Sequence, residues 1–283
     1  MKTTPQSAFK NGFSRQDREQ NDRAGFTFTE LLVVIAVIGM LALMILPTLA
    51  RTSPNSNAAQ CMNNLRQLTT AWRMYADDNK DLLVASLALA GTTYNGRPVW
   101  MTGILNVGGV NPSRYDINTD VVKSPLWNYC GQNASLFRCP ADLSSVTVGG
   151  KVYPRVRSYS MSQVFDFGEW LPASNWRTYA KMSDIMKPNH TFVFIDENPA
   201  WINDAAFATD CNGLPGSGTS GPQIVDLPTI SHNKAGGLSF ADGHIEMHKW
   251  KGRLILTAPG TIPTNADDLD DFVYLASNTT VRK

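Results

Sequence analysis

The stretch GFTFTELLVVIAVIGMLALMILPTLA, residues Gly25–Ala50, sets the organisation of the whole chain. Residues 31–50 contain no charged side chain, and a helix of that length, rising about 1.5 Å per residue, covers the roughly 30 Å hydrocarbon core of a bilayer. The stretch therefore predicts one transmembrane helix, residues 26–50. Glu30 lies near its start, where an unpaired carboxylate carried into lipid would cost several kcal/mol. Cleavage before Phe26 would create an α-amino group close enough to pair with Glu30.

These residues resemble the prepilin signal of type IV pilins and type II secretion pseudopilins. A polar leader ends in Gly25, Phe26 follows as the first mature residue, and Glu30 is the fifth. Pro47 falls where helices of this family commonly carry a proline. The resemblance implies cleavage after Gly25 by a prepilin peptidase, N-methylation of Phe26, and packing of the apolar helix, with Glu30 and Pro47, among other pilin or pseudopilin subunits.

Two simpler interpretations compete with the prepilin one. An ordinary secretory signal is cleaved after its apolar region, whereas here the glycine precedes that region. A plain N-terminal membrane anchor fits the apolar run equally well. Only the resemblance at Phe26 and Glu30 argues against the plain anchor.

The distribution of charged residues along the 283-residue chain predicts the orientation of the helix in the membrane. The leader carries five Lys or Arg and three Asp or Glu, so the positive-inside bias keeps it in the cytoplasm and sends later residues across the inner membrane. The remaining chain is nearly balanced, with 20 basic and 21 acidic residues, and does not indicate a nucleic-acid partner. We expect a cleaved leader (1–25), a transmembrane and assembly helix (26–50), a stem helix (51–81) and a periplasmic or extracellular globular head (82–283).

Apolar side chains recur every three or four residues along the predicted stem helix. They line one face, which we expect to pack on a sheet: Ala58, Cys61, Leu65, Leu68, Trp72 and Tyr75. Thr191–Asp196 is a β-branched and aromatic run, typical of a central strand covered on both faces. The acids between Asp196 and Pro222 lie among Gly, Asn, Ser and Pro, so we interpret that segment as a solvated loop. It lacks the spacing of a calcium-binding loop.

The chain has four cysteines, all beyond the predicted span: Cys61, Cys130, Cys139 and Cys211. An even number in an oxidising compartment predicts at least one disulfide, and three pairings are possible. We favour Cys61–Cys139, because one lies on the stem helix and the other in a Cys-Pro loop. Free buried thiols are the alternative, and the absence of a C-x-x-C spacing argues against a zinc ribbon.

Two strand-like runs, 237–241 and 244–250, flank Asp242-Gly243, and this dipeptide predicts a two-residue hairpin turn. His232 precedes Asp242 by ten positions. This spacing resembles a C-terminal His-x9-Asp-Gly signature of large-headed prepilin-like proteins, found chiefly in planctomycete- and verrucomicrobia-type bacteria. We expect His232 to lie near the hairpin and to brace it by a hydrogen bond to Asp242.

His244, Glu246 and His248 alternate along the second run, so they share one face, and His232 could approach them. The geometry permits zinc, although such spacing is common by chance. The chain contains no nucleophile elbow, P-loop or dinucleotide fingerprint. We therefore expect no enzymatic activity and no cofactor.

The sequence as a whole predicts an α+β protein with a long N-terminal helix and a mainly antiparallel sheet. The expected function is that of a prepilin-like subunit of a type IV pilus or type II secretion pseudopilus. The alternative is a membrane-anchored, extracytoplasmic head that binds or hydrolyses a ligand, with its Trp- and Tyr-rich loops serving carbohydrate or peptide.

Overall fold

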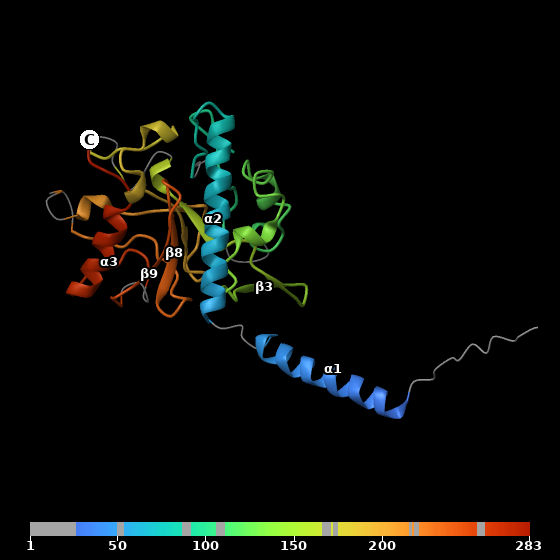
Figure 1. Cartoon of the computed structure of the whole chain (residues 1–283). Coiled ribbons are helices and arrows are strands. Elements are labelled where there is room, and N and C mark those ends of the chain that lie inside the picture. The colour runs from blue at the N-terminus through green and yellow to red at the C-terminus, as the bar shows by residue number, and fades with distance from the viewer. Residues whose placement is uncertain are drawn as a thin grey trace, which may run out of the picture. The chain divides into compact units, whose positions relative to one another are not determined.

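The computed structural model describes residues 27–49, 54–86, 92–105, 111–165, 171, 175–214, 217, 221–253 and 258–283 (Figure 1). The chain divides into two compact units, residues 1–51 and 52–283. The first unit contains helix α1 (Phe28–Leu49), and the second, which we call the C-terminal unit, contains the other helices and all described strands. The mixed helix and strand content confirms the predicted α+β class.

Helix α1 begins with a capping box formed by Thr27 and Glu30. The Thr27 backbone N–H donates to Oε2 of Glu30 at 2.8 Å, and the Thr27 hydroxyl donates to the same oxygen at 2.7 Å. The Glu30 N–H in turn donates to Oγ1 of Thr27 at 3.3 Å. Such reciprocal bonds satisfy N–H groups that a helix start leaves without partners. Thr27 therefore gives the Glu30 carboxylate an uncharged hydrogen-bond partner at the start of α1.

Large apolar side chains are exposed along α1, among them Phe28, Leu31, Val33, Ile35, Ile38 and Met40. Among the described residues, no helix is both long and apolar enough to cross a bilayer. The transmembrane helix expected over residues 26–50 is not found in that part of the chain. Gly25 and Phe26 lie outside the described residues, and Pro47 lies within α1.

Helix α2 (Pro54–Asp78) lies within the stem helix expected over residues 51–81, and it buries the predicted apolar face except for the half-buried Ala58. Proline is favoured at the first position of a helix, because its missing N–H would have no partner there. The buried face carries Cys61, Leu65, Leu68, Trp72 and Tyr75. This face packs on the sheet beside β8 (Ala235–Phe240) (Figure 1).

The main sheet has five described strands in the order β7-β5-β6-β8-β9. Only the β5–β7 pair is parallel, so the sheet is mainly antiparallel, as predicted. The predicted central strand is β6, and all its residues are buried. Besides β8, the strands are β5 (Tyr159–Ser162), β6 (Phe192–Asp196), β7 (Ala206–Phe207) and β9 (Ile245–Lys249).

A C-terminal helix, α3 (Ala266–Ser277), was not predicted. Asn265 caps it by accepting the Asp268 N–H at 3.0 Å. Backbone N–H groups of Lys251 and Gly252, which follow β9, donate to the Asp271 carboxylate. These bonds join α3 to the end of the sheet.

Successive side chains of a strand point to opposite faces of the sheet, and the contacts of β8 and β9 show that α2 and α3 pack on opposite faces. A Cβ at Gly237 would lie 2.6 Å from Cδ1 of Leu65, so this position faces α2. His248 pairs with the adjacent residue Gly236 and stacks on Tyr274 of α3, with ring centroids 3.5 Å apart. The sheet therefore lies between the two helices (Figure 1).

Shorter elements complete the described part of the C-terminal unit. Two small hairpins pair β1 (Thr93–Tyr94) with β2 (Arg97–Pro98), and β3 (Ser145–Val148) with β4 (Lys151–Pro154). The short 3₁₀ helices are η1 (Pro112–Arg114), η2 (Val121–Lys123), η3 (Ala134–Phe137), η4 (Gln163–Phe165), η5 (Met182–Asp184), η6 (Pro188–His190) and η7 (Cys211–Gly213).

Strands β8 and β9 form the predicted hairpin, but its turn differs from the expected one. Gly243 N–H donates to the Phe240 carbonyl at 2.9 Å, and Phe240 N–H donates to the His244 carbonyl at 3.0 Å. Gly243 has a φ of +97°, whereas Asp242 is not among the described residues with positive φ. A two-residue primed turn needs positive φ at its first central residue, so the loop is instead a three-residue turn closed by a glycine.

Candidate functional site

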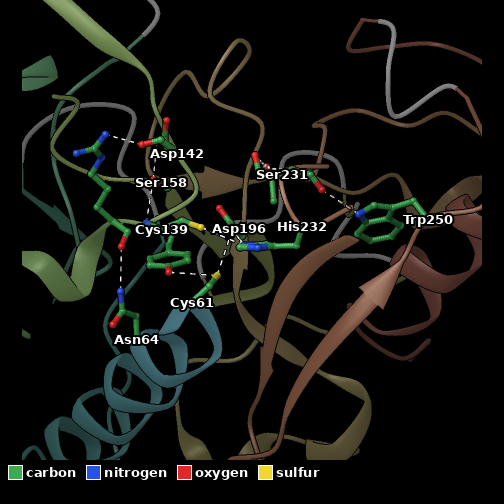
Figure 2. Close-up of polar contacts among 12 residues, drawn as sticks. Cys61, Asn64, Cys139, Asp142, Ser158, Asp196, Ser231, His232 and Trp250 are labelled. Atoms are coloured by element: carbon green, nitrogen blue, oxygen red, sulfur yellow. Dashed lines mark hydrogen bonds and ion pairs between the residues drawn. The ribbon is translucent and has the colours of Figure 1, made fainter. Parts of the chain in front are cut away.

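Four side chains that carry metal-ligating or acid–base groups meet inside the C-terminal unit: Cys61, Cys139, Asp196 and His232 (Figure 2). One ligand atom from each lies within 4.8 Å of all the others, and no other group of three or more His, Cys, Asp or Glu in the described residues is this close. We call them the buried cluster, because their exposed fractions are 0, 0, 1 and 6 %.

Short polar contacts connect the cluster. The Cys61 thiol donates to Oδ2 of Asp196 at 3.2 Å, and Sγ of Cys139 lies 3.1 Å from Nε2 of His232. The same imidazole nitrogen lies 3.4 Å from Oδ2 of Asp196. The Tyr159 hydroxyl donates to Sγ of Cys61 at 3.3 Å. The four groups thus form one connected polar network in the core.

The loop that carries Cys139 is fixed to α2. Nδ2 of Asn64 donates to the Arg138 carbonyl at 3.0 Å and to the Ser135 carbonyl at 3.2 Å. Since Asn64 lies almost one helical turn after Cys61, the helix that supplies one sulfur also holds the loop that supplies the other. The loop around Cys139 is therefore a structural partner of α2.

Backbone and hydroxyl bonds set the direction of the Cys139 side chain. Asp142 N–H donates to the Cys139 carbonyl at 3.0 Å and closes a turn. Cys139 N–H donates to Oγ of Ser158 at 3.1 Å, and the Ser158 hydroxyl donates to Oδ2 of Asp142 at 2.6 Å (Figure 2). These bonds lock the loop against the segment that leads into β5.

Asp196 is the last residue of β6, and His232 lies in the turn before β8. Thr229 N–H donates to the Asp196 carbonyl at 2.8 Å, which ties the two segments together. Nε1 of Trp250 donates to the Thr229 carbonyl at 3.0 Å. Asn233 has a φ of +58°, so the chain reverses immediately after His232. The imidazole reaches the cluster through this reversal.

Burial and mutual contacts shift the pKa values of the cluster. The contact with Cys61, opposed by burial and aided by His232, lowers the pKa of Cys139 to about 5. Burial lowers the pKa of His232, but its bonds to Asp196 and Cys139 outweigh burial and raise it to about 9. The polar contact with Cys139 raises the pKa of Cys61, and burial raises the pKa of Asp196. The arrangement favours a Cys139 thiolate beside a His232 imidazolium.

The predicted disulfide is not present. All four cysteines lie in the described residues, and each is a free, buried thiol. The favoured pair Cys61 and Cys139 does come together, within 4.8 Å between ligand atoms, but a disulfide requires sulfur atoms about 2.05 Å apart. Cys130 and Cys211 lie outside the cluster. The free-thiol alternative describes this structure.

The remaining histidines do not join the cluster. Nδ1 of His244 lies 2.6 Å from Oδ1 of Asp242, and Nδ1 of His248 lies 3.2 Å from Oε1 of Glu246. The expected hydrogen bond between His232 and Asp242 is not formed. The two residues lie at opposite ends of β8, and His232 instead contacts Cys139 and Asp196.

Sequence reasoning missed Asp196 as a site residue, because the acids after β6 looked like those of a solvated loop. Asp196 and Glu197 are 1 and 0 % exposed. A signal was available: Phe192, Phe194 and Asp196 share one face of a strand predicted to be buried on both sides. An acid in register with buried aromatic residues needs polar partners.

Comparisons with known proteins identify only the N-terminal segment. Residues 20–46 match the family model described as the prokaryotic N-terminal methylation motif. No curated protein and no solved structure matches the chain. The matched segment contains Gly25, Phe26 and Glu30, and supports a type IV prepilin-like N-terminus.

Proposed function

We propose that the chain is a prepilin-like subunit that a prepilin peptidase cleaves between Gly25 and Phe26. Phe26 is then N-methylated, and the subunit joins a type IV pilus or a type II secretion pseudopilus. The observation that carries this proposal is the methylation-motif match over residues 20–46. The C-terminal signature with His232, Asp242 and Gly243 belongs to the same proposed family assignment.

The surface of α1 supports assembly. Exposed apolar side chains occur at consecutive positions, including Leu31, Leu32, Val33, Val34 and Ile35, which together surround the helix. A helix that is apolar all round is stable only when lipid or other protein covers it. We place it in the inner membrane before assembly, with the leader in the cytoplasm and the head outside.

The proposed role is non-enzymatic. The buried cluster contains groups that act in catalysis elsewhere, but each of its side chains is at most 6 % exposed. A catalytic residue must come within hydrogen-bond reach of a substrate. A structural role fits this burial better.

The test is mass spectrometry of the mature N-terminus, together with electrophoresis of sheared surface filaments from the native host. The expected N-terminal peptide begins with methylated Phe26, and the protein appears in the filament fraction or in the pseudopilus. An unmodified N-terminus with the protein confined to membranes would contradict the proposal and favour a plain anchor.

A further inference from the structure

We propose that Cys61, Cys139, Asp196 and His232 bind a zinc ion that fastens helix α2 to the sheet. The proposal is independent of filament assembly. It rests on the donor set, the spacing of the ligand atoms and the burial of the site.

The donor set is one that zinc takes in proteins. Two cysteine sulfurs, one imidazole nitrogen and one carboxylate oxygen provide four ligands of the types that bind zinc tetrahedrally. Thiolates disfavour magnesium and calcium, which prefer oxygen ligands. With four protein ligands the zinc shell is closed, as in structural sites.

The spacing of the ligand atoms also fits zinc. Zinc bonds of about 2.0–2.3 Å in a tetrahedron place neighbouring ligand atoms about 3.3–3.8 Å apart. Three of the pairs are separated by 3.2 Å (Cys61–Asp196), 3.1 Å (Cys139–His232) and 3.4 Å (His232–Asp196). All pairs lie within 4.8 Å. Shifts of a few tenths of an ångström would bring these three pairs to tetrahedral spacing.

A zinc ion would compensate most of the negative charge that its three anionic ligands carry when they bind it. Two thiols and a carboxyl lie together in the core, where burying ionised groups without compensation is costly. A zinc ion would bind both thiolates, the Asp196 carboxylate and Nε2 of neutral His232, and the displaced protons would pass to solvent. The Tyr159 hydroxyl, 3.3 Å from Sγ of Cys61, would donate to a bound thiolate.

A groove beside the cluster provides a route of entry for a metal ion. Nδ1 of His232 has no hydrogen-bond partner among the described residues, so only its contacts in the cluster orient the imidazole. Cys139 lines this groove of about 600 Å³, together with Asn64, Arg138 and Pro140. The groove brings solvent close to one ligand while the cluster itself stays buried.

A zinc ion here would cross-link distant parts of the chain. Cys61 and Asp196 are 135 residues apart in sequence, and Cys139 and His232 are 93 apart. One ion would join α2, the Cys-Pro loop, the end of β6 and the turn before β8. Closing such long loops is the situation in which a cross-link stabilises a fold most.

The test uses the full chain purified in detergent without added metal. Elemental analysis should find about one zinc ion per chain, as expected for a single closed site. After removal of metal with a chelator, Co²⁺ should restore binding and produce thiolate-to-cobalt charge-transfer absorption. The cobalt measurement needs no substitution, so it does not depend on the folding of a variant.

Variants identify the ligands. Cys139→Ser and Asp196→Asn should each lower zinc affinity at least about tenfold, since each removes one ligand from the shell. Cys130→Ser is the matched control, because Cys130 is a buried thiol outside the cluster, and it should retain zinc like the wild type.

Three results would overturn the proposal. One is a chain that neither contains zinc nor binds Zn²⁺ or Co²⁺ after chelation and reduction. Another is an intact mass lower by two hydrogen atoms with Cys61 and Cys139 joined in one peptide, because a disulfide would consume both sulfur ligands. Equal zinc content in Cys139→Ser and Cys130→Ser would also assign the metal to another place.

Discussion

Glu30 combines a charge and a helix cap, and substitutions can separate the two. Its carboxylate accepts from the backbone N–H and the hydroxyl of Thr27. Glutamine at this position can still accept the Thr27 N–H, as in other capping boxes, but it carries no charge. Leucine removes both properties. Thr27→Ala removes the hydroxyl contacts and leaves the charge.

We predict that Glu30→Gln and Glu30→Leu both lower filament or pseudopilus assembly at least about tenfold, while Thr27→Ala assembles nearly normally. Without the Glu30 carboxylate, the Phe26 amine would be buried without its proposed partner, at a cost of several kcal/mol. A tenfold loss of assembly corresponds to only about 1.4 kcal/mol, so the expected loss is at least that large. The measurement is subunit abundance in sheared filaments after cleavage is confirmed in each variant. Normal assembly of Glu30→Gln would show that assembly does not need the charge of Glu30.

Asp226 is a second residue whose environment predicts a measurable effect. Burial and the charge of Asp204, opposed by the Ala208 N–H bond, raise the pKa of Asp226 from 3.8 to about 7. Between these values the folded chain keeps a proton that the unfolded chain has lost, so stability falls as pH rises through this window and levels off above pH 7.

We predict that Asp226→Asn flattens this fall, by on the order of 2–4 kcal/mol between pH 4 and pH 8. Asparagine can still accept the Ala208 N–H, so the hydrogen bond at 2.6 Å is kept. Urea unfolding at several pH values, with wild type and variant side by side, measures the difference. This difference includes the charge interaction between Asp226 and Glu197, which the substitution also removes. Parallel pH profiles would contradict the assigned pKa.

At the scale of elements, Gly237 sets the distance between α2 and the sheet. A Cβ there would lie 2.6 Å from Cδ1 of Leu65 and 3.4 Å from Sγ of Cys61. Leu65 is fully buried, so it has little room to move. A side chain at this position would therefore push the helix outward.

We predict that Gly237→Ala destabilises the C-terminal unit by about 1–3 kcal/mol, as overpacking of a core does. Gly221→Ala is the control, since a Cβ at Gly221 meets nothing within 4 Å, and it should change stability by less than about 0.5 kcal/mol. Thermal unfolding of the two variants is the measurement. Equal melting temperatures would mean that α2 does not approach β8 this closely.

The elements differ in how well the sequence predicts them. A continuous run of β-branched and aromatic residues predicts β6, and three- and four-residue spacing predicts the buried face of α2. Helix α3 was missed, although Asn265 followed by acids in the first turn is a recognisable helix start. The Asp-Gly dipeptide predicts the hairpin but not its turn, because the loop length depends on how Phe240 pairs with His244.

The buried cluster could be predicted only in part. A shared role for Cys61 and Cys139 follows from helix position and a Cys-Pro loop, and the structure does bring them together. Asp196 and His232 join them only through the strand order of the sheet, which places β6 beside β8. Local spacing cannot reveal such contacts, and it wrongly paired His232 with Asp242.

At the scale of the whole molecule, the two compact units have different proposed roles. The unit of residues 1–51 carries the methylation motif and the exposed apolar helix. The C-terminal unit has its own core, which runs from Cys61 on α2 to Ala276 on α3 and includes the sheet between them. A unit with a complete core of this kind is expected to fold without the first helix.

We therefore predict that a protease site inserted between Leu49 and Pro54 will release residues 54–283 as a folded, soluble protein. Its melting temperature should lie within about 2 °C of that of the intact chain, because a change of 1 kcal/mol shifts a unit of this size by about 2–4 °C. Circular dichroism before and after cleavage measures this. Aggregation or loss of a cooperative transition would show that α1 contributes to the core of the second unit. In that case, moving α1 into a filament would also disturb the packing of the C-terminal unit. If the C-terminal unit folds independently, α1 can enter lipid or a filament without loss of stability in that unit.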